Sequence, residues 1–229
     1  MNKPSLLLGM PLLVLSLSWP ALAETARSAD DASFILQADA SGTDVIAFAT
    51  AGGDTVNLIK QSSEFGLKQK GSTFPAPLTT TNDIESSGLS VGQGFIITQP
   101  FYWNLNEANS AWSARFSARQ RGQSPSAFHA GVYAPARSYL NVALGAGTNH
   151  AQAVIRTMKK APIDDDLIGP VAVRPVGRIH NMYILKAKSP AASRDKWDLL
   201  EQVGVESGPE AFRPLDEGGC ALVEQSNNN

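Results

Sequence analysis

Apolar and amphipathic stretches alternate through the first half of the chain. Residues 45–49 form a continuous apolar run, which predicts a strand covered on both faces. The turn 50–54 follows, and a helix is expected to run from the N-cap Asp54 to about Phe65, with Gly66 closing its C-terminal end. A strand, a turn and a helix in this order make one α/β unit.

The same unit recurs along the chain. Residues 74–78 and 94–98 predict two more strands, although two prolines are unfavourable in the first of them. Helices are predicted near 84–87 and from 106 to 122, and the second of these has a regular apolar face. Strands that alternate with helices favour an α/β fold with a largely parallel sheet.

The last third of the chain has a different pattern. A long helix is predicted over 124–144, with a kink at Pro135, and another between residues 149 and 162. Two stretches, 179–186 and 197–203, have the composition of strands. These elements would add extra helices and C-terminal strands to the α/β units.

The N-terminus has the pattern of a secretory signal peptide. A lysine precedes an apolar stretch over 6–19, and Ala21-Leu22-Ala23 forms the small-x-small pattern that signal peptidase cleaves. The stretch is shorter than the roughly 20 apolar residues of a spanning helix, and an uncleaved membrane anchor is the alternative. We therefore predict a signal peptide over residues 1–23 and a periplasmic protein.

The mature chain is expected to form one domain. We predict a polar lead-in over 24–31, an α/β domain over 32–223 and a disordered tail over 224–229. The whole chain is 43% apolar, and the roughly 200 residues that remain after cleavage suffice for a core of ordinary size. The single cysteine, Cys220, cannot form an internal disulfide, so stability must come from that core.

Charge and histidine spacing exclude two classes of function. The net charge of the whole chain is −2, and it becomes −3 when residues 1–23, which contain one lysine and no acid, are removed. The charges are spread along the chain, whereas nucleic-acid binding needs a basic patch. His129, His150 and His180 have no second ligand at i+3 or i+4, so no metal site and no cofactor are expected. The acidic run 164–166 is typical of a solvated loop.

One short motif raises an enzymatic alternative. Gly88-Leu-Ser90-Val-Gly92 matches the G-x-S-x-G pattern of hydrolases, in which the serine lies on a sharp turn from a strand into a helix. Here no strand leads into the motif and a strand follows it. An esterase that uses Ser90 is therefore the least favoured function, and we expect no catalytic residue.

Three loops after predicted strands favour a ligand site. In an open parallel sheet, ligands bind outside the carboxyl ends of the strands, where the loops 50–54, 79–83 and 100–103 would meet. The loops supply carboxylates, hydroxyls, glycine backbone and two aromatic rings, which suit a small polar ligand with an ammonium or amide group. For Tyr102 and Trp103, a place in the core is the alternative.

Several stretches of this sequence resemble a known family. Residues 44–66 are similar to the second lobe of type I periplasmic binding proteins of the branched-chain amino-acid (leucine-binding) type, which are the solute receptors of ABC importers. Further similar stretches follow in the same order: Gly92–Phe95, Phe101–Asn104, Ala130–Tyr133, Gly177–Tyr183 and Ala211–Cys220. The resemblance covers residues 32–223.

The resemblance implies a fold and a task. It implies two Rossmann-like lobes that close around a hinge on a ligand, with recognition alone and no bond made or broken. The solute would be a branched-chain amino acid or a related amide, and the protein partner would be the membrane permease of the importer. By position, the ligand-binding residues would be Ala51, Gly52, Gly53, Asp54, Thr81, Asn82, Asp83, Tyr102 and Trp103.

The sequence departs from the family in one respect. In full members the first lobe lies between the signal peptide and the equivalent of Asp31, so we expect this chain to lack most of that lobe. The helix 124–144 would then lose the surface on which it packs. Cys220 would either have lost a disulfide partner or be an ordinary free thiol. A single-lobe interaction module without ligand transport is the alternative function.

Overall fold

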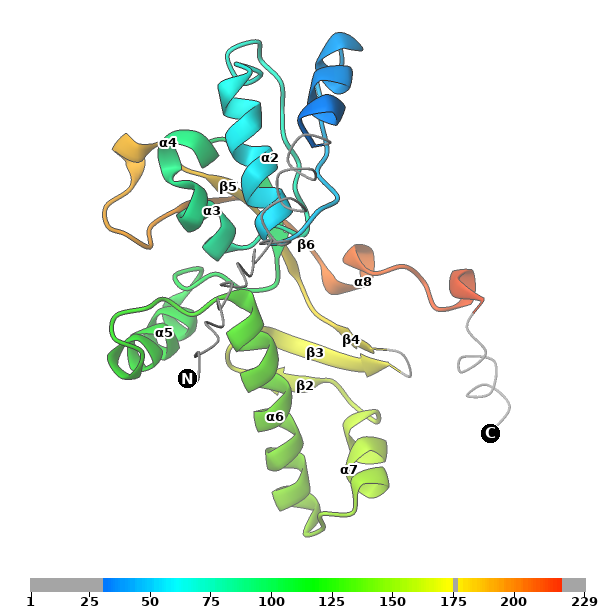
Figure 1. Ribbon diagram of the computed structural model, residues 1–229. Helices are drawn as coiled ribbons and strands as arrows, with labels where there is room; N and C mark the ends of the chain where they lie inside the picture. Colours follow the sequence, from blue (N-terminus) through cyan, green and yellow to red (C-terminus); the bar gives the residue numbers. More distant parts are fainter. Residues whose placement is uncertain (1–30, 175–176, 220–229) are drawn as a thin grey trace, which may run out of the picture.

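The computed structural model describes residues 31–174 and 177–219 (Figure 1). Four predicted features lie outside the described residues: the signal peptide over 1–23, all but the last residue of the lead-in over 24–31, Cys220, and the tail over 224–229.

Three extended segments lie side by side in parallel, as the alternating pattern predicted. The first two are joined by the Phe48 N–H, which donates to the Pro75 carbonyl at 2.8 Å, and the last two by the Ala76 N–H, which donates to the Ile96 carbonyl at 2.7 Å. The third segment is the regular strand β1 (Ile96–Gln99), whereas the first two are held by isolated bridges. The prolines of the second segment lack N–H groups, which limits regular pairing there.

Helices follow the parallel segments. Their bounds are α2 (Gly53–Glu64), α3 (Thr81–Ser87), α4 (Leu89–Gly92) and α5 (Glu107–Arg119), and residues 31–40 form a helix before them. The N-cap of α2 is Gly52 and not the predicted Asp54, because the φ of 62° at this position suits glycine. Gly66 follows α2 with a φ of 69°, as predicted.

The G-x-S-x-G motif does not form a nucleophile elbow. Ser90 is exposed within the short helix α4, and the helix α3 precedes it where a hydrolase would have a strand.

The parallel segments continue into an antiparallel sheet. β5 (Met182–Ala187) pairs with β1, and β6 (Leu200–Glu206) pairs with β5, so the strand order is β1-β5-β6. Both pairings are antiparallel, with Ile97 opposite Leu185. The α/β class is therefore confirmed, and the predicted C-terminal strands are present, but they run against the parallel segments.

A second group of elements lies between β1 and β5 in the sequence. It contains α6 (Ala127–Ala146), α7 (Ala151–Met158), β2 (Ile163–Asp165), β3 (Gly169–Arg174) and β4 (Gly177–Ile179). The last three strands form an antiparallel sheet in the order β2-β3-β4. In Figure 1, α6, α7 and this sheet lie at one end of the molecule, α2, α3 and α4 lie at the other, and α5 lies between them.

Three details of this group correct the prediction. The helix α6 begins after Ser126 and not at Ser124, because the His129 ring accepts the Ser126 N–H and caps the helix start. The predicted strand 179–186 is divided between β4 and β5. The acidic run is not a solvated loop throughout, because Asp165 is buried in β2 and accepts the main-chain N–H groups of the two residues after Asp166.

The main hydrophobic core lies against the sheet. Phe48, Phe74 and Phe95 come one from each parallel segment, with ring centroids 5.0 Å apart for Phe74 and Phe95 and 5.5 Å apart for Phe48 and Phe95. A smaller cluster joins the second group of elements through Phe101, Trp112, Ala130 and Leu167. Among the described residues, no helix combines the length and the apolar character that crossing a membrane requires. The short remaining elements are η1 (Pro190–Ala192), α8 (Gly208–Ala211) and η2 (Asp216–Gly218).

Candidate functional site

Two helices begin at the carboxyl edge of the parallel segments. The first two segments run in the same direction, and each leads into a helix, so α2 and α3 start at the same edge of the sheet. The two helices also pack against each other. The loop 50–54 and the turn 79–83 are therefore brought to one edge, as predicted.

The start of α2 presents exposed backbone. Ala51, Gly52 and Gly53 are exposed, and the N-cap Gly52 has no side chain to cap the first N–H groups of the helix. Behind them, the hydroxyls of Thr50 and Thr55 lie 2.9 Å apart. The first N–H groups of a helix have no partner inside it and carry partial positive charge, so this edge offers donors to an anionic or carbonyl oxygen.

The start of α3 is closed by its own capping box. The N–H and the hydroxyl of Thr80 both donate to Asp83 Oδ2 at 2.8 Å, and the Asp83 N–H donates to the Thr80 hydroxyl at 3.3 Å. The Asp83 carboxylate is half-buried, and one of its oxygens is therefore engaged within the chain. Asn82, beside it, is exposed.

A buried glutamine ties this turn to the end of β1. Gln99 is buried, its amide nitrogen donates to the Thr79 carbonyl at 3.0 Å, and its amide oxygen accepts the hydroxyl of the buried Thr81 at 3.4 Å. Gln99 was not among the predicted residues. The sequence signal for it is a polar residue at the end of a strand, in a position that the strand period places in the core.

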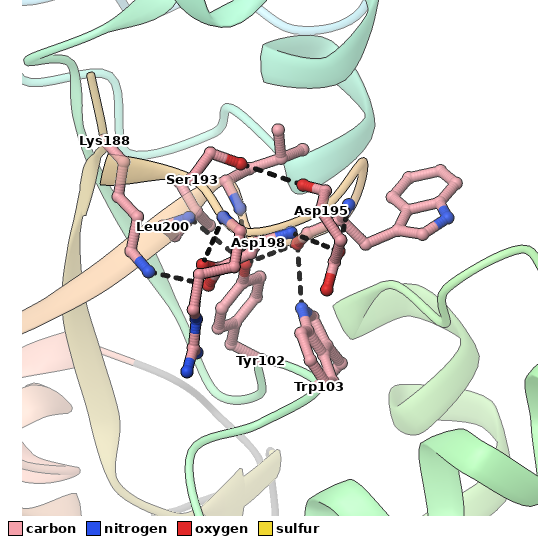
Figure 2. Close-up of polar contacts among 10 residues, drawn as sticks. Tyr102, Trp103, Lys188, Ser193, Asp195, Asp198 and Leu200 are labelled. Atoms are coloured by element: carbon pink, nitrogen blue, oxygen red, sulfur yellow. Dashed lines mark hydrogen bonds and ion pairs between the residues drawn. The ribbon is translucent and has the colours of Figure 1, made fainter. Parts of the chain in front are cut away.

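Tyr102 and Trp103 turn away from this edge toward the loop before β6. The Tyr102 ring is 2% exposed, and its hydroxyl donates to the Trp197 carbonyl at 2.6 Å while accepting the N–H groups of Leu199 and Leu200 (Figure 2). The Trp103 indole N–H donates to the same carbonyl at 2.8 Å. Burial raises the pKa of Tyr102 to about 12, although the N–H groups that it accepts act in the opposite direction.

An ionic cluster fixes the other end of that loop. Asp198 is fully buried, and its carboxylate accepts from Lys188 Nζ at 2.6 Å and from Arg194 Nε at 3.0 Å (Figure 2). Burial alone would raise the pKa of Asp198, but the hydrogen bonds from Arg194 and Lys188 outweigh it and hold this pKa at about 2. The carboxylate is therefore ionised at neutral pH.

The structure divides the nine predicted residues into two groups. Seven lie in the loop and turn at the carboxyl edge, and of these Thr81 is buried while Asp54 and Asp83 are half-buried. Tyr102 and Trp103 instead hold the loop 195–200, and Tyr102 occupies the core position that was its alternative. Within the described residues, no three His, Cys, Asp or Glu side chains are grouped so as to hold a metal ion.

Comparisons with known proteins agree with this architecture. Residues 22–193 match the family described as "Periplasmic binding protein". Among solved structures, a periplasmic binding protein from Burkholderia mallei is 36% identical with a TM-score of 0.74, and covers 83% of this chain and 50% of its own. A branched chain amino acid ABC transporter periplasmic ligand-binding protein from Burkholderia xenovorans LB400 is 34% identical with a TM-score of 0.77, over 83% of this chain and 51% of its own.

More distant structures share the fold. An amino acid ABC transporter substrate-binding protein from Pseudomonas fluorescens Pf-5 is 20% identical with a TM-score of 0.72, over 82% of this chain and 50% of its own. This chain thus spans about half the length of the solved structures that it matches. Among curated proteins, none matches the chain.

Proposed function

Because this chain belongs to the periplasmic binding protein family, we propose that it is a solute-binding component of an ABC importer and that its solute is a branched-chain amino acid or a related amide. The family supports recognition of a solute without chemistry on it. The Burkholderia xenovorans relative, which is 34% identical, is a branched chain amino acid ABC transporter periplasmic ligand-binding protein, and this likeness favours a branched-chain amino acid. The permease of the importer would be the protein partner, and the periplasm the place of action.

The observation that carries this proposal is the shared edge at which α2 and α3 begin. The exposed backbone of Gly52 and Gly53 offers N–H donors for the carboxylate or carbonyl of a solute. The carboxylates of Asp54 and Asp83 offer partners for its ammonium or amide nitrogen. Donors and acceptors on neighbouring loops at one edge are the arrangement that a zwitterion or an amide requires.

Residues behind the shared edge of α2 and α3 would hold its loops in position. Gln99 joins the turn before α3 to the sheet, and Tyr102 and Trp103 fix the segment that follows β1. In this proposal Tyr102 and Trp103 act through the backbone that they hold.

A charge-removing variant on α2 tests the proposed site. Asp54 lies in the first turn of α2, and Glu64 is the last residue of the same helix, far from the edge. The mature chain would be titrated with leucine, valine and a small amide, with binding followed by NMR. We expect Asp54→Asn to weaken binding and Glu64→Gln to leave it unchanged. Equal effects of the two substitutions would reject the edge as the binding site.

A second function is favoured by one exposed face. Phe128 and Val132, which are four residues apart and so on one side of α6, are 72% and 73% exposed, which is unusual for neighbouring large apolar side chains. A single-lobe interaction module would use this face and need no solute. Binding of a solute that depends on Asp54 would favour the transport function, whereas a chain that binds none of the titrated solutes would favour the module.

A further inference from the structure

A cavity lies beside α5, and its lining includes none of the residues at the edge where α2 and α3 begin. It has a volume of about 420 Å³ and is bounded by α5 on one side and by residues 195–197 on the other. Trp103 and the connection 122–124 complete its lining. The volume lies within the range of small-molecule sites, about 300–1,000 Å³, and is enough for one compact ligand.

The two indole rings in the lining have their N–H groups engaged elsewhere. The Trp103 N–H donates to the Trp197 carbonyl at 2.8 Å, and the Trp197 indole N–H donates to the Gly122 carbonyl at 3.1 Å. Ring faces are therefore what these residues can offer to a ligand. An aromatic ligand gains more than a saturated one from such faces, because rings pack favourably in stacked and edge-to-face arrangements.

The α5 face of the cavity is made of small side chains. Ser110, Ser113, Ala114 and Ser117 follow the i, i+3, i+4, i+7 spacing of one helix face. The hydroxyls of Ser110 and Ser117 donate to main-chain carbonyls at 3.0 and 2.9 Å. Ser113 differs, because it is 3% exposed and its hydroxyl has no hydrogen-bond partner among the described residues. A buried hydroxyl without a partner is unfavourable, and a polar atom of a ligand would supply one.

The charged residues of the lining already have partners. Asp195 accepts the N–H groups of Trp197 and Asp198 at 2.8 and 3.1 Å. Lys196 forms an ion pair with Glu85 at 3.1 Å, and its ammonium lies 4.9 Å from the centre of the Trp197 ring. Because these charges are already paired within the chain, the lining favours a neutral ligand.

We propose that this cavity is a second binding site, for a neutral one-ring aromatic compound that carries one hydroxyl. The ring would pack against Trp103 and Trp197, and the hydroxyl would pair with Ser113. Such a ligand would contact α5 and the loop before β6 together. The site is separate from the proposed solute site, since its lining does not include residues 51–54 or 81–83.

A matched pair of substitutions on α5 tests this site. Ala114 lines the cavity, while Ala118 lies one turn further along α5, is also exposed, and is not in the lining. The probe would be 4-methylphenol, titrated into the mature chain and followed by NMR, with 4-methylcyclohexanol as its saturated counterpart. We expect saturable binding of 4-methylphenol, weaker binding of the saturated alcohol, a loss of about tenfold or more in affinity in Ala114→Leu, and no change in Ala118→Leu.

Thermal unfolding of both variants would show that each remains folded. Absence of saturable binding, equal binding of the two probes, or equal effects of the two substitutions would overturn the proposal. A titration of leucine into the Ala114→Leu variant separates the cavity proposal from the proposed function. A solute site at the start of α2 and α3 would keep its affinity for leucine in that variant.

Discussion

The hydroxyl of Tyr102 lies 2.6 Å from the main-chain oxygen of Trp197, a residue 95 positions further along the chain. The same hydroxyl accepts two main-chain N–H groups, from Leu199 and Leu200. One side chain therefore pairs with three backbone groups at the start of β6, and the two N–H groups among them are buried.

Loss of this hydroxyl is expected to destabilise the fold. Tyr102→Phe leaves the N–H groups of Leu199 and Leu200 without their partner, and each unsatisfied buried group costs about 1–3 kcal/mol. We expect the free energy of unfolding in urea to fall by about 2 kcal/mol or more. Tyr133→Phe, at a ring that is 36% exposed, is the control and should change this free energy little. Equal stability of the two variants would show that the Tyr102 hydroxyl is not needed.

Acid is expected to weaken the fold through Asp198. Its pKa of about 2 in the folded chain is below the ordinary value of 3.8, so the carboxylate contributes stability above about pH 4, and this stability is lost as pH falls through 2. Urea midpoints measured between pH 7 and pH 2 should fall most steeply at the acid end. In Asp198→Asn the fold should be weaker at pH 7 and should lose less between pH 4 and pH 2. A slope unchanged by the substitution would contradict this assignment.

The exported protein is expected to begin at Glu24. The small-x-small pattern ends at Ala23, so cleavage by signal peptidase would leave Glu24 as the first residue. N-terminal sequencing of periplasmic material measures this directly. Material from that compartment that still begins at Met1 would disprove the predicted cleavage.

Binding of leucine to this chain is expected to be weak. The chain spans about half the length of its solved relatives, and charge pairs at an exposed edge are worth only about 0–1 kcal/mol each. Since each ~1.4 kcal/mol is tenfold in affinity, dissociation constants of about 1 mM or weaker are expected for leucine, isoleucine and valine. Calorimetry would show a micromolar constant if the edge were sufficient by itself.

Local features of the fold could be predicted from the sequence, and distant pairings could not. The unit of strand, turn and helix over 45–66 is set by an apolar run followed by a helix with a glycine end, and both signals lie within the unit itself. The antiparallel addition of β5 to β1 depends on Ile97 meeting Leu185 after a long excursion of the chain. No local pattern encodes such a register, and the strand predicted over 179–186, part of which forms β5, was predicted without its direction.

In the candidate site too, local features could be predicted and distant contacts could not. Gly52, Gly53 and Asp83 were predicted from loops that follow strands, and the structure places them at one edge. The role of Tyr102 was left open between ligand and core, because its partner, Trp197, is distant in the sequence. Asp165 was misassigned for a similar reason, since Arg178, which lies 3.6 Å from its carboxylate, is contributed by a different strand.

The three phenylalanines that meet in the core imply an order of assembly. Phe48, Phe74 and Phe95 lie within a short span of sequence, so their contact closes only short loops, while β5 must close a long loop to reach β1. A chain that emerges from its N-terminus can therefore complete this aromatic cluster before β5 and β6 are available. Until those strands arrive, the open edge of β1 is the part of the nascent chain most in need of protection from aggregation.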